Sequence, residues 1–163
     1  MAKAANPEIA LLLDNLDQAY NRKGWHGPNL RGSIRLVTVR EASWRPHLKR
    51  HSIADIVVHC AYWKYAVRRR LRDDKRGSFP LKGSNWFALP PVLSEKEWKD
   101  YIALLDDEHR SLRQAIAELA ANQLHSKSPG TKIRNSTLVY AIAAHDLYHT
   151  GQIQILKRLQ SAD

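Results

Sequence analysis

Three polar residues near the C-terminus interrupt a helical stripe of apolar side chains. His145, His149 and Gln152 lie between Ile142 and Leu156 at alternating spacings of three and four residues, which is the periodicity of a helix face that packs into a core. Burying imidazole and amide groups without partners costs about 1 to 3 kcal/mol each. The sequence therefore predicts that something completes these side chains, and a metal ion is the leading candidate.

His59 supplies a third candidate ligand. It lies between Ile56 and Trp63 in a second helical stripe, whereas His145 and His149, four residues apart, share one face of their helix. Three neutral imidazoles suit zinc, nickel, copper or ferrous iron, and they leave a coordination position open for water or substrate. The residues alone also allow three core or rim histidines that bond to tyrosine, aspartate or backbone groups.

Several other residues are candidates for supporting roles. Asp146 gives the stripe a likeness to the H-E-x-x-H motif, but a helix-surface charge or a hydrogen bond to a ligand is favoured over a catalytic base. Gln152 is expected to contact a bound ligand, to orient an imidazole or to bridge two helices. Trp63 is interpreted as a core or rim aromatic that can wall a pocket. His109 is interpreted as a packed histidine rather than a fourth ligand, and Cys60 as a small buried apolar residue.

Four long helices must position these side chains, and each is marked by an apolar stripe, most of them also by a capping motif. Their predicted ranges are 7–22, 52–72, 94–122 and Asn135 or Ser136 to 159. No β alternation is present, so they predict an all-α four-helix bundle, a fold that builds metal sites in its core from facing helices. At 163 residues the chain fits one domain spanning residues 1–163.

The connections between these helices differ in length. A short helix from residue 28 to about 36 and an irregular stretch through Trp44-Arg45-Pro46 are expected between the first two. Residues 73–93, which contain Trp86 and Phe87, form a long loop between the second and third. Loops of this length inside a compact domain are often functional. We therefore expect this loop to shape access to the histidines.

The formal charge of +10 is concentrated in one region. Residues 31–76 contain 13 Lys or Arg and 4 Asp or Glu, and the basic groups cluster at 68–76. The favoured interpretation is a solvated helix end whose cations match the helix dipole. An anion site is an alternative, and nucleic-acid binding through residues 31–76 is disfavoured because no recognition motif is visible.

The compartment is predicted from features that the sequence lacks. A single cysteine excludes an intrachain disulfide, and the N-terminus has no signal-peptide pattern. No apolar run reaches the length needed to cross a bilayer. These observations predict a cytoplasmic protein without membrane association.

Several segments resemble the DinB-like superfamily of bacterial four-helix bundles, which is also associated with YfiT-type metal-dependent hydrolases. They cover nearly the whole chain, and the most specific is H-x-x-x-H-x-G-Q-I in the last helix. The segments that carry the resemblance are Trp25 to Arg31, Trp44-Arg45-Pro46, His51-Ser52-Ile53, Val58 to Trp63, and Ala144 to Ile153.

The resemblance implies a function as well as a fold. It implies a metal triad of His59, His145 and His149, with nickel or zinc as the divalent ion, and a homodimer. Relatives include hydrolases and S-transferases that use a low-molecular-weight thiol, so a metal-dependent enzyme acting on a small molecule is expected. The competing expectation is a metal-binding stress-response protein that acts through a partner without catalysis.

Overall fold

Helices and loops make up the whole of residues 6–161, the part of the chain that the computed structural model describes. Seven helices follow one another, and only three isolated β-bridges occur in this range. The helices are α1 (Pro7–Tyr20), α2 (Leu30–Ser33), α3 (Val39–Ser43), α4 (Ile53–Arg72), α5 (Glu95–Ala117), α6 (Ala121–Leu124) and α7 (Asn135–Gln160). The all-α prediction is confirmed. The predicted domain of residues 1–163 extends at each end beyond the described residues.

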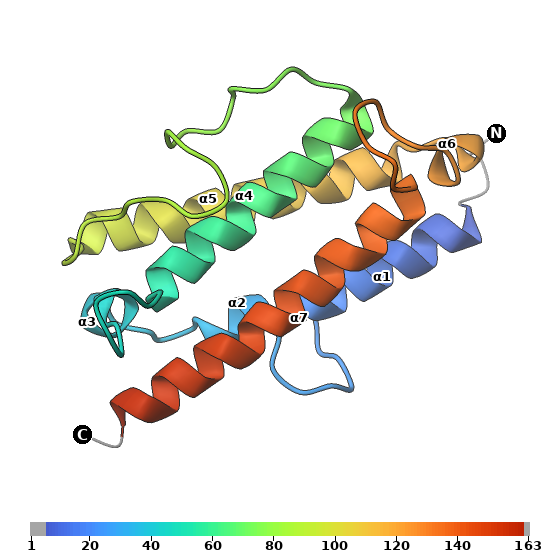
Figure 1. Ribbon diagram of the computed structural model, residues 1–163. Coiled ribbons are helices and arrows are strands. Elements are labelled where there is room, and N and C mark those ends of the chain that lie inside the picture. Colours follow the sequence, from blue (N-terminus) through green and yellow to red (C-terminus); the bar gives the residue numbers. More distant parts are fainter. Residues whose placement is uncertain (1–5, 162–163) are drawn as a thin grey trace.

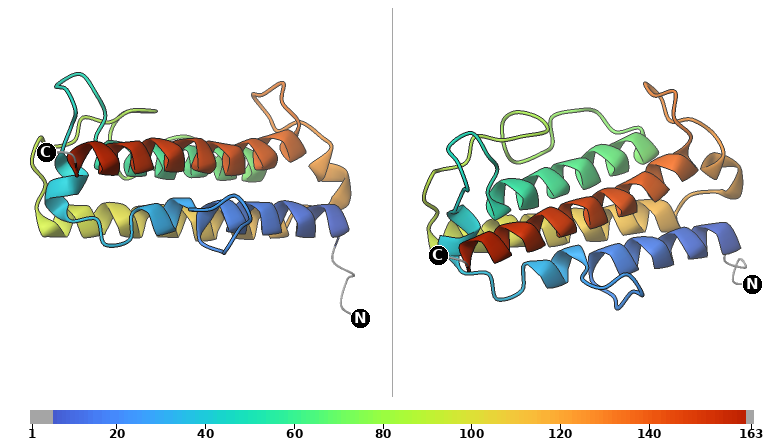
Figure 2. Two further views of the ribbon diagram at one scale, coloured as in Figure 1. Left: turned by 90° about the horizontal axis from the view of Figure 1, so that it is seen from below. Right: turned by 60° about the horizontal axis from the view of Figure 1, so that its bottom comes forward.

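The longest helices, α1, α4, α5 and α7, pack into a bundle of two layers. Helices α4 and α7 form one layer, and α1 and α5 form the other (Figure 2). The loop between α4 and α5 leaves the end of α4 and runs back along it (Figure 1). This loop therefore lies beside the same helix that carries His59.

Side-chain caps start α1, α4 and α5 where the sequence predicts them, whereas α7 begins without one. Asn6 accepts hydrogen bonds from the first turn of α1, and Pro7 follows at the first helical position. Ser52 and Asp55 form a reciprocal capping box on α4, and Ser94 with Glu97 does the same on α5. These caps fix the starting points, and hence which face of each helix meets the core.

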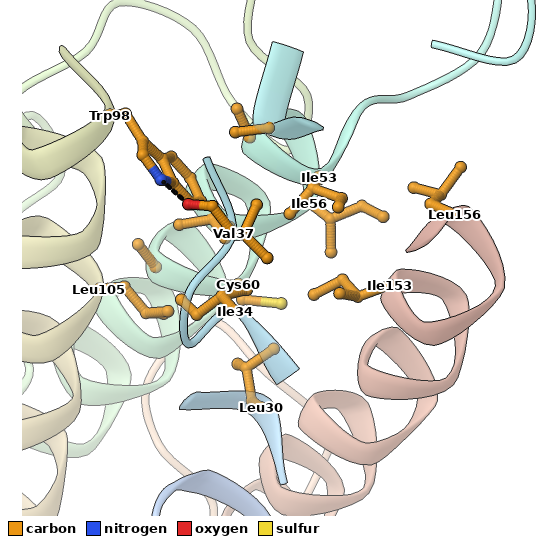
Figure 3. Packing of buried hydrophobic residues seen from close by; sticks show 14 of the residues in the cluster. Leu30, Ile34, Val37, Ile53, Ile56, Cys60, Trp98, Leu105, Ile153 and Leu156 are labelled. Atoms are coloured by element: carbon orange, nitrogen blue, oxygen red, sulfur yellow. Dashed lines mark hydrogen bonds between the residues drawn. The ribbon is translucent and has the colours of Figure 1, made fainter. Parts of the chain in front are cut away.

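The apolar core fills the space between the two layers. Figure 3 shows Ile53, Ile56 and Cys60 of α4 facing Ile153 of α7 and Leu105 of α5. The indole of Trp98 donates a hydrogen bond to the carbonyl oxygen of Val37 at 3.0 Å, so its one polar atom is satisfied inside the core (Figure 3). Cys60 is fully buried, as predicted.

Three elements differ from the predictions, and the first is the short helix expected from residue 28 to about 36, which is confined to α2 at Leu30–Ser33. The stretch before Trp44 was expected to be irregular, but it contains α3, which starts at a capping box between Thr38 and Glu41. The third long helix was expected to reach residue 122, but α5 ends at Ala117. There the chain turns at Ala120, whose extended backbone N–H donates to the side chain of Gln123, and the separate helix α6 begins.

A helix that crosses a membrane must be both long and apolar. Between residues 6 and 161 none of the helices could span a bilayer.

Candidate metal centre

Three histidines meet between α4 and α7, near the middle of the bundle. The Nε2 atom of His145 lies 3.1 Å from Nε2 of His59 and 3.1 Å from Nε2 of His149. His59 comes from the second turn of α4, and His145 and His149 come from consecutive turns of α7. The structure thus brings together the three residues that the sequence predicted as ligands, and their potential ligand atoms lie within 4.8 Å of one another.

Hydrogen bonds at the far side of two rings determine which nitrogen faces the centre. The Nδ1 atom of His59 lies 2.8 Å from the carbonyl oxygen of Asn85, and Nδ1 of His149 lies 2.7 Å from Oε1 of Gln152. Because a carbonyl oxygen can only accept a hydrogen bond, each Nδ1 carries the proton and donates it. The lone pair of each Nε2 therefore points at the centre, which is the tautomer that binds a metal.

Burial keeps all three imidazoles neutral at neutral pH. It lowers the pKa of His145 to about 3, helped by the nearby His149, His59 and Lys64. It also lowers the pKa of His149 to about 4, against the opposing effect of the hydrogen bond to Gln152. The pKa of His59 is lowered by burial too. Neutral imidazole is the form that donates a lone pair to a metal.

The separation of the nitrogens fits a divalent metal ion. Ligand nitrogens at about 2.0 to 2.1 Å from a zinc-like ion lie about 2.8 to 3.4 Å apart, with octahedral arrangements at the lower end and tetrahedral ones at the upper end. The observed 3.1 Å separations fall in this range. In the protein alone, Nε2 of His145 can carry at most one proton, which is too few for the two lone pairs that face it, so the cluster is incomplete. A cation would satisfy all three nitrogens at once.

Trp86 covers the histidines from the loop between α4 and α5. Its indole stacks on the ring of His59, with centroids 3.9 Å apart, and on the ring of His51 at 3.5 Å. The indole of Trp63 meets His59 edge-on and donates a hydrogen bond to Oδ1 of Asn85 at 3.0 Å. This loop therefore contacts the histidines through Trp86, but it does not line the cavity beside His145, where Gly130, Thr131 and Ile133 lie instead.

Asn85 is the functional residue that the sequence did not indicate. Its carbonyl orients His59 while its side chain holds Trp63. Its backbone φ is 64°, in the left-handed region that asparagine tolerates better than most residues. The only sequence signal was its place after Gly83 and Ser84 in a loop, because a main-chain contact leaves no mark on the side-chain pattern.

Asp146 is buried and paired, so the helix-surface interpretation is wrong. Neither it nor its partner Lys64 has an exposed side chain, and the Lys64 ammonium donates to the Asp146 carboxylate. This buried ion pair lies beside the histidines, and the Lys64 ammonium also lies 4.8 Å from the centre of the Tyr20 ring. Lys64 could have been found from the sequence, because it falls on the apolar stripe of α4 between Cys60 and Val67.

A second potential ligand group shares His145 but is chemically unsuited to a metal. Cys60, His145 and Asp146 also have potential ligand atoms within 4.8 Å of one another. Burial raises the pKa of the Cys60 thiol, which keeps it protonated, and the Asp146 carboxylate is already engaged by Lys64. The three-histidine group is therefore the better site. His109 lies apart from it and stacks on Tyr20 with centroids 3.6 Å apart, so it is a packed histidine as predicted.

The histidine cluster is reached from a cavity of about 330 Å³ between α4 and α7. Apolar side chains such as Val67, Leu138 and Ile142 line most of it, and Trp63 walls it as predicted. His145 lines the same cavity and is the most exposed of the three histidines. A small molecule in this cavity would lie beside the side chain of His145.

The comparisons with known proteins agree with this architecture. The sequence profile of the DinB superfamily matches residues 24–153, a segment that includes all three histidines. Neither the curated proteins nor the solved structures gave a match to the chain. The matched segment covers well over half of the sequence. The chain belongs to the DinB superfamily.

Proposed function

We propose that this protein is a divalent-metal-dependent enzyme, with nickel or zinc held by His59, His145 and His149. The observation that carries the proposal is the convergence of three neutral Nε2 atoms at 3.1 Å separations beside a cavity. Three protein ligands leave a position for water or substrate, as in catalytic rather than structural zinc sites. A bound ion would lower the pKa of water or of a thiol and thereby supply a nucleophile near neutral pH.

The chain's own residues prepare the centre and exclude water from one side of it. The carbonyl of Asn85 and the side chain of Gln152 hold the protons on Nδ1 of His59 and His149. The indole of Trp86 covers the ring of His59. Because these contacts exist before any ligand binds, little reorganisation is needed on binding.

The surroundings favour transfer from a low-molecular-weight thiol over hydrolysis. Hydrolysis of a stable bond commonly uses a carboxylate as a general base, and the carboxylate next in sequence to His145 is engaged by Lys64. A thiol depends less on a general base for its deprotonation, because its ordinary pKa of about 8.5 is already close to neutral pH. We therefore propose S-transfer as the first reaction to test and hydrolysis as the second.

A substrate screen with and without chelator tests this function. Cysteine as the thiol with 1-chloro-2,4-dinitrobenzene as the electrophile tests transfer, and 4-nitrophenyl acetate tests hydrolysis. We expect nickel- or zinc-dependent turnover that EDTA and His149→Ala abolish. His125→Ala is the matched control, since His125 is exposed and pairs with Glu8 far from the centre. Metal binding without any turnover would favour a metal-binding protein that acts through a partner.

A further inference from the structure

A second cavity, of about 550 Å³, lies between the last turns of α4 and residues 76–84 of the following loop. Four cationic side chains line it, Arg69 and Arg70 from α4 and Arg76 and Lys82 from the loop. No acidic residue lines it. The predicted basic cluster at 68–76 is therefore not simply a solvated helix end, because part of it faces a concave surface.

The arginines near the end of α4 divide into two groups. Arg68 lies 3.2 Å from Glu108 of α5 and Arg72 lies 3.1 Å from Glu118, which directly follows α5, so both arginines are neutralised. By contrast, the four cationic side chains that line the cavity have no such partner: across residues 6–161, no carboxylate oxygen lies within 4.0 Å of their side-chain nitrogens. Burial, together with the positive charges of Arg69 and Arg76, lowers the pKa of Arg70. An anion is what would relieve this repulsion.

Aromatic rings form another part of the cavity wall. The rings of Tyr62 and Phe79 meet edge-on with centroids 5.4 Å apart, which joins α4 to the loop. The hydroxyl of Tyr65 accepts a hydrogen bond from the backbone N–H of Gly77 at 3.2 Å. These contacts hold the loop in place and leave a partly apolar surface beside the cations. A ligand that fits both features carries a negative group on an apolar or aromatic body.

The cavity adjoins the metal centre without using its ligands. Gly83 and Ser84 line it, and the next residue is Asn85, which orients His59. Trp63 and Arg70 line both this cavity and the smaller one that reaches His145. The two cavities are therefore neighbours across shared side chains.

We propose that the larger cavity is a binding site for a small organic phosphate. Its dianionic phosphate would be held by Arg69, Arg70, Arg76 and Lys82, and its organic body would lie against the aromatic wall. Arginine forks match phosphate oxygens in pairs, and a phosphate monoester carries nearly two negative charges at neutral pH. A nucleic acid fits less well, because single modules that bind duplexes bury roughly 600 Å² or more of open surface, whereas this site is a cavity.

Calorimetric titration of the full-length protein with three probes tests the ligand class. Phenyl phosphate carries both features, inorganic phosphate only the charge, and benzyl alcohol only the ring. We expect phenyl phosphate to bind about tenfold more tightly than inorganic phosphate, and benzyl alcohol not to bind measurably. Equal affinity for the two phosphates, or absence of phenyl phosphate binding, would overturn the proposal. Competition by a single-stranded or duplex oligonucleotide at matched phosphate concentration would overturn it in favour of nucleic acid.

Substitutions with a matched control locate the site. Lys82→Gln is expected to weaken phenyl phosphate binding about threefold and Arg70→Gln about tenfold. Lys75→Gln removes the same charge from the same loop, but Lys75 does not line the cavity. This variant should therefore bind phenyl phosphate as tightly as the wild-type protein. Equal weakening by Lys75→Gln and Lys82→Gln would show attraction by the overall charge and refute a defined site. Lys82 is exposed, so its replacement leaves the fold intact.

Metal loading separates this proposal from the metal-dependent function. The titrations are run on EDTA-treated protein and on nickel-loaded protein, and phenyl phosphate should bind to both with similar affinity. Binding that requires nickel, or that His149→Ala removes, would assign the phosphate to the metal centre and overturn the proposal. A protein without metal-dependent turnover that still binds phenyl phosphate would refute only the proposed catalysis.

Discussion

Two polar clusters lie next to each other in the core between α4 and α7, and they are completed in different ways. Lys64 and Asp146 are both fully buried and their charges neutralise each other within the chain, although Oδ1 of Asp146 has no hydrogen-bond partner. His59, His145 and His149 instead present three neutral nitrogens to one another with too few protons to share. The first cluster belongs to the architecture, whereas the second is complete only when a cation is added.

The arginines at the end of α4 show the same difference. Arg68 and Arg72 are paired with glutamates in α5 and directly after it, whereas Arg69 and Arg70 face a cavity without an acidic partner. In both comparisons, the candidate ligand site is the cluster whose charges or lone pairs are not matched by an opposite charge or a proton from within the chain. The following predictions test whether the two core clusters really differ in this way.

The largest effect is expected from breaking the buried ion pair. Asp146→Ala leaves the Lys64 ammonium buried without its partner and should lower the free energy of unfolding by about 3 to 5 kcal/mol. Urea denaturation measures this with and without metal. The double variant Lys64→Met with Asp146→Leu removes both charges and should recover most of the loss. A loss below about 1 kcal/mol for Asp146→Ala would mean that the pair is not a structural unit.

A moderate effect is expected when the orientation of a histidine is disturbed. Gln152→Ala removes the acceptor that holds the proton on Nδ1 of His149, so nickel or zinc affinity should fall about 10- to 100-fold. Competition with a chromophoric chelator measures the affinity. Gln154→Ala, two residues along the same helix, is the control. Indistinguishable affinities for the two variants would show that the Gln152 contact does not support the centre.

The smallest effect is expected at His109, a histidine outside the metal centre, whose replacement should change how the free energy of unfolding depends on pH. Burial lowers the pKa of His109 to about 2, whereas the unfolded chain titrates near 6.5. Only the unfolded state then takes up the proton below about pH 6.5, so the free energy of unfolding falls as the pH falls. His109→Phe should reduce this slope by up to about 1.4 kcal/mol per pH unit. An unchanged slope between pH 6 and 4 would contradict a neutral, packed His109.

The long helices could be predicted because their signals are local. Caps such as Ser52 with Asp55 mark the starts, and apolar spacing marks the faces that pack. The end of α5 was missed because Leu119 continues the apolar spacing and is itself buried beyond the helix. Helix α3 was missed because five residues are too few to show a periodic face.

The side chains of the candidate site could be predicted from the sequence, whereas the backbone contact to it could not. The positions of His59, His145 and His149 on apolar stripes identify the cluster, and Gln152 follows one turn later. The contact from the Asn85 carbonyl depends on how a loop folds back, which residue types do not reveal. The pairing of Lys64 with Asp146 required the register between two helices. The homodimer, the cytoplasmic location and the thiol cofactor stay predictions.

Metal analysis of untagged protein tests the central claim most directly. Inductively coupled plasma mass spectrometry would be run on the wild-type chain, on His59→Ala, His145→Ala and His149→Ala, and on the control His125→Ala. Wild type and control should bind close to one equivalent of nickel or zinc. Each of the three variants at the centre should bind little, because two imidazoles do not form a stable site for these ions. Full occupancy in the His145→Ala and His149→Ala proteins would contradict the three-histidine centre.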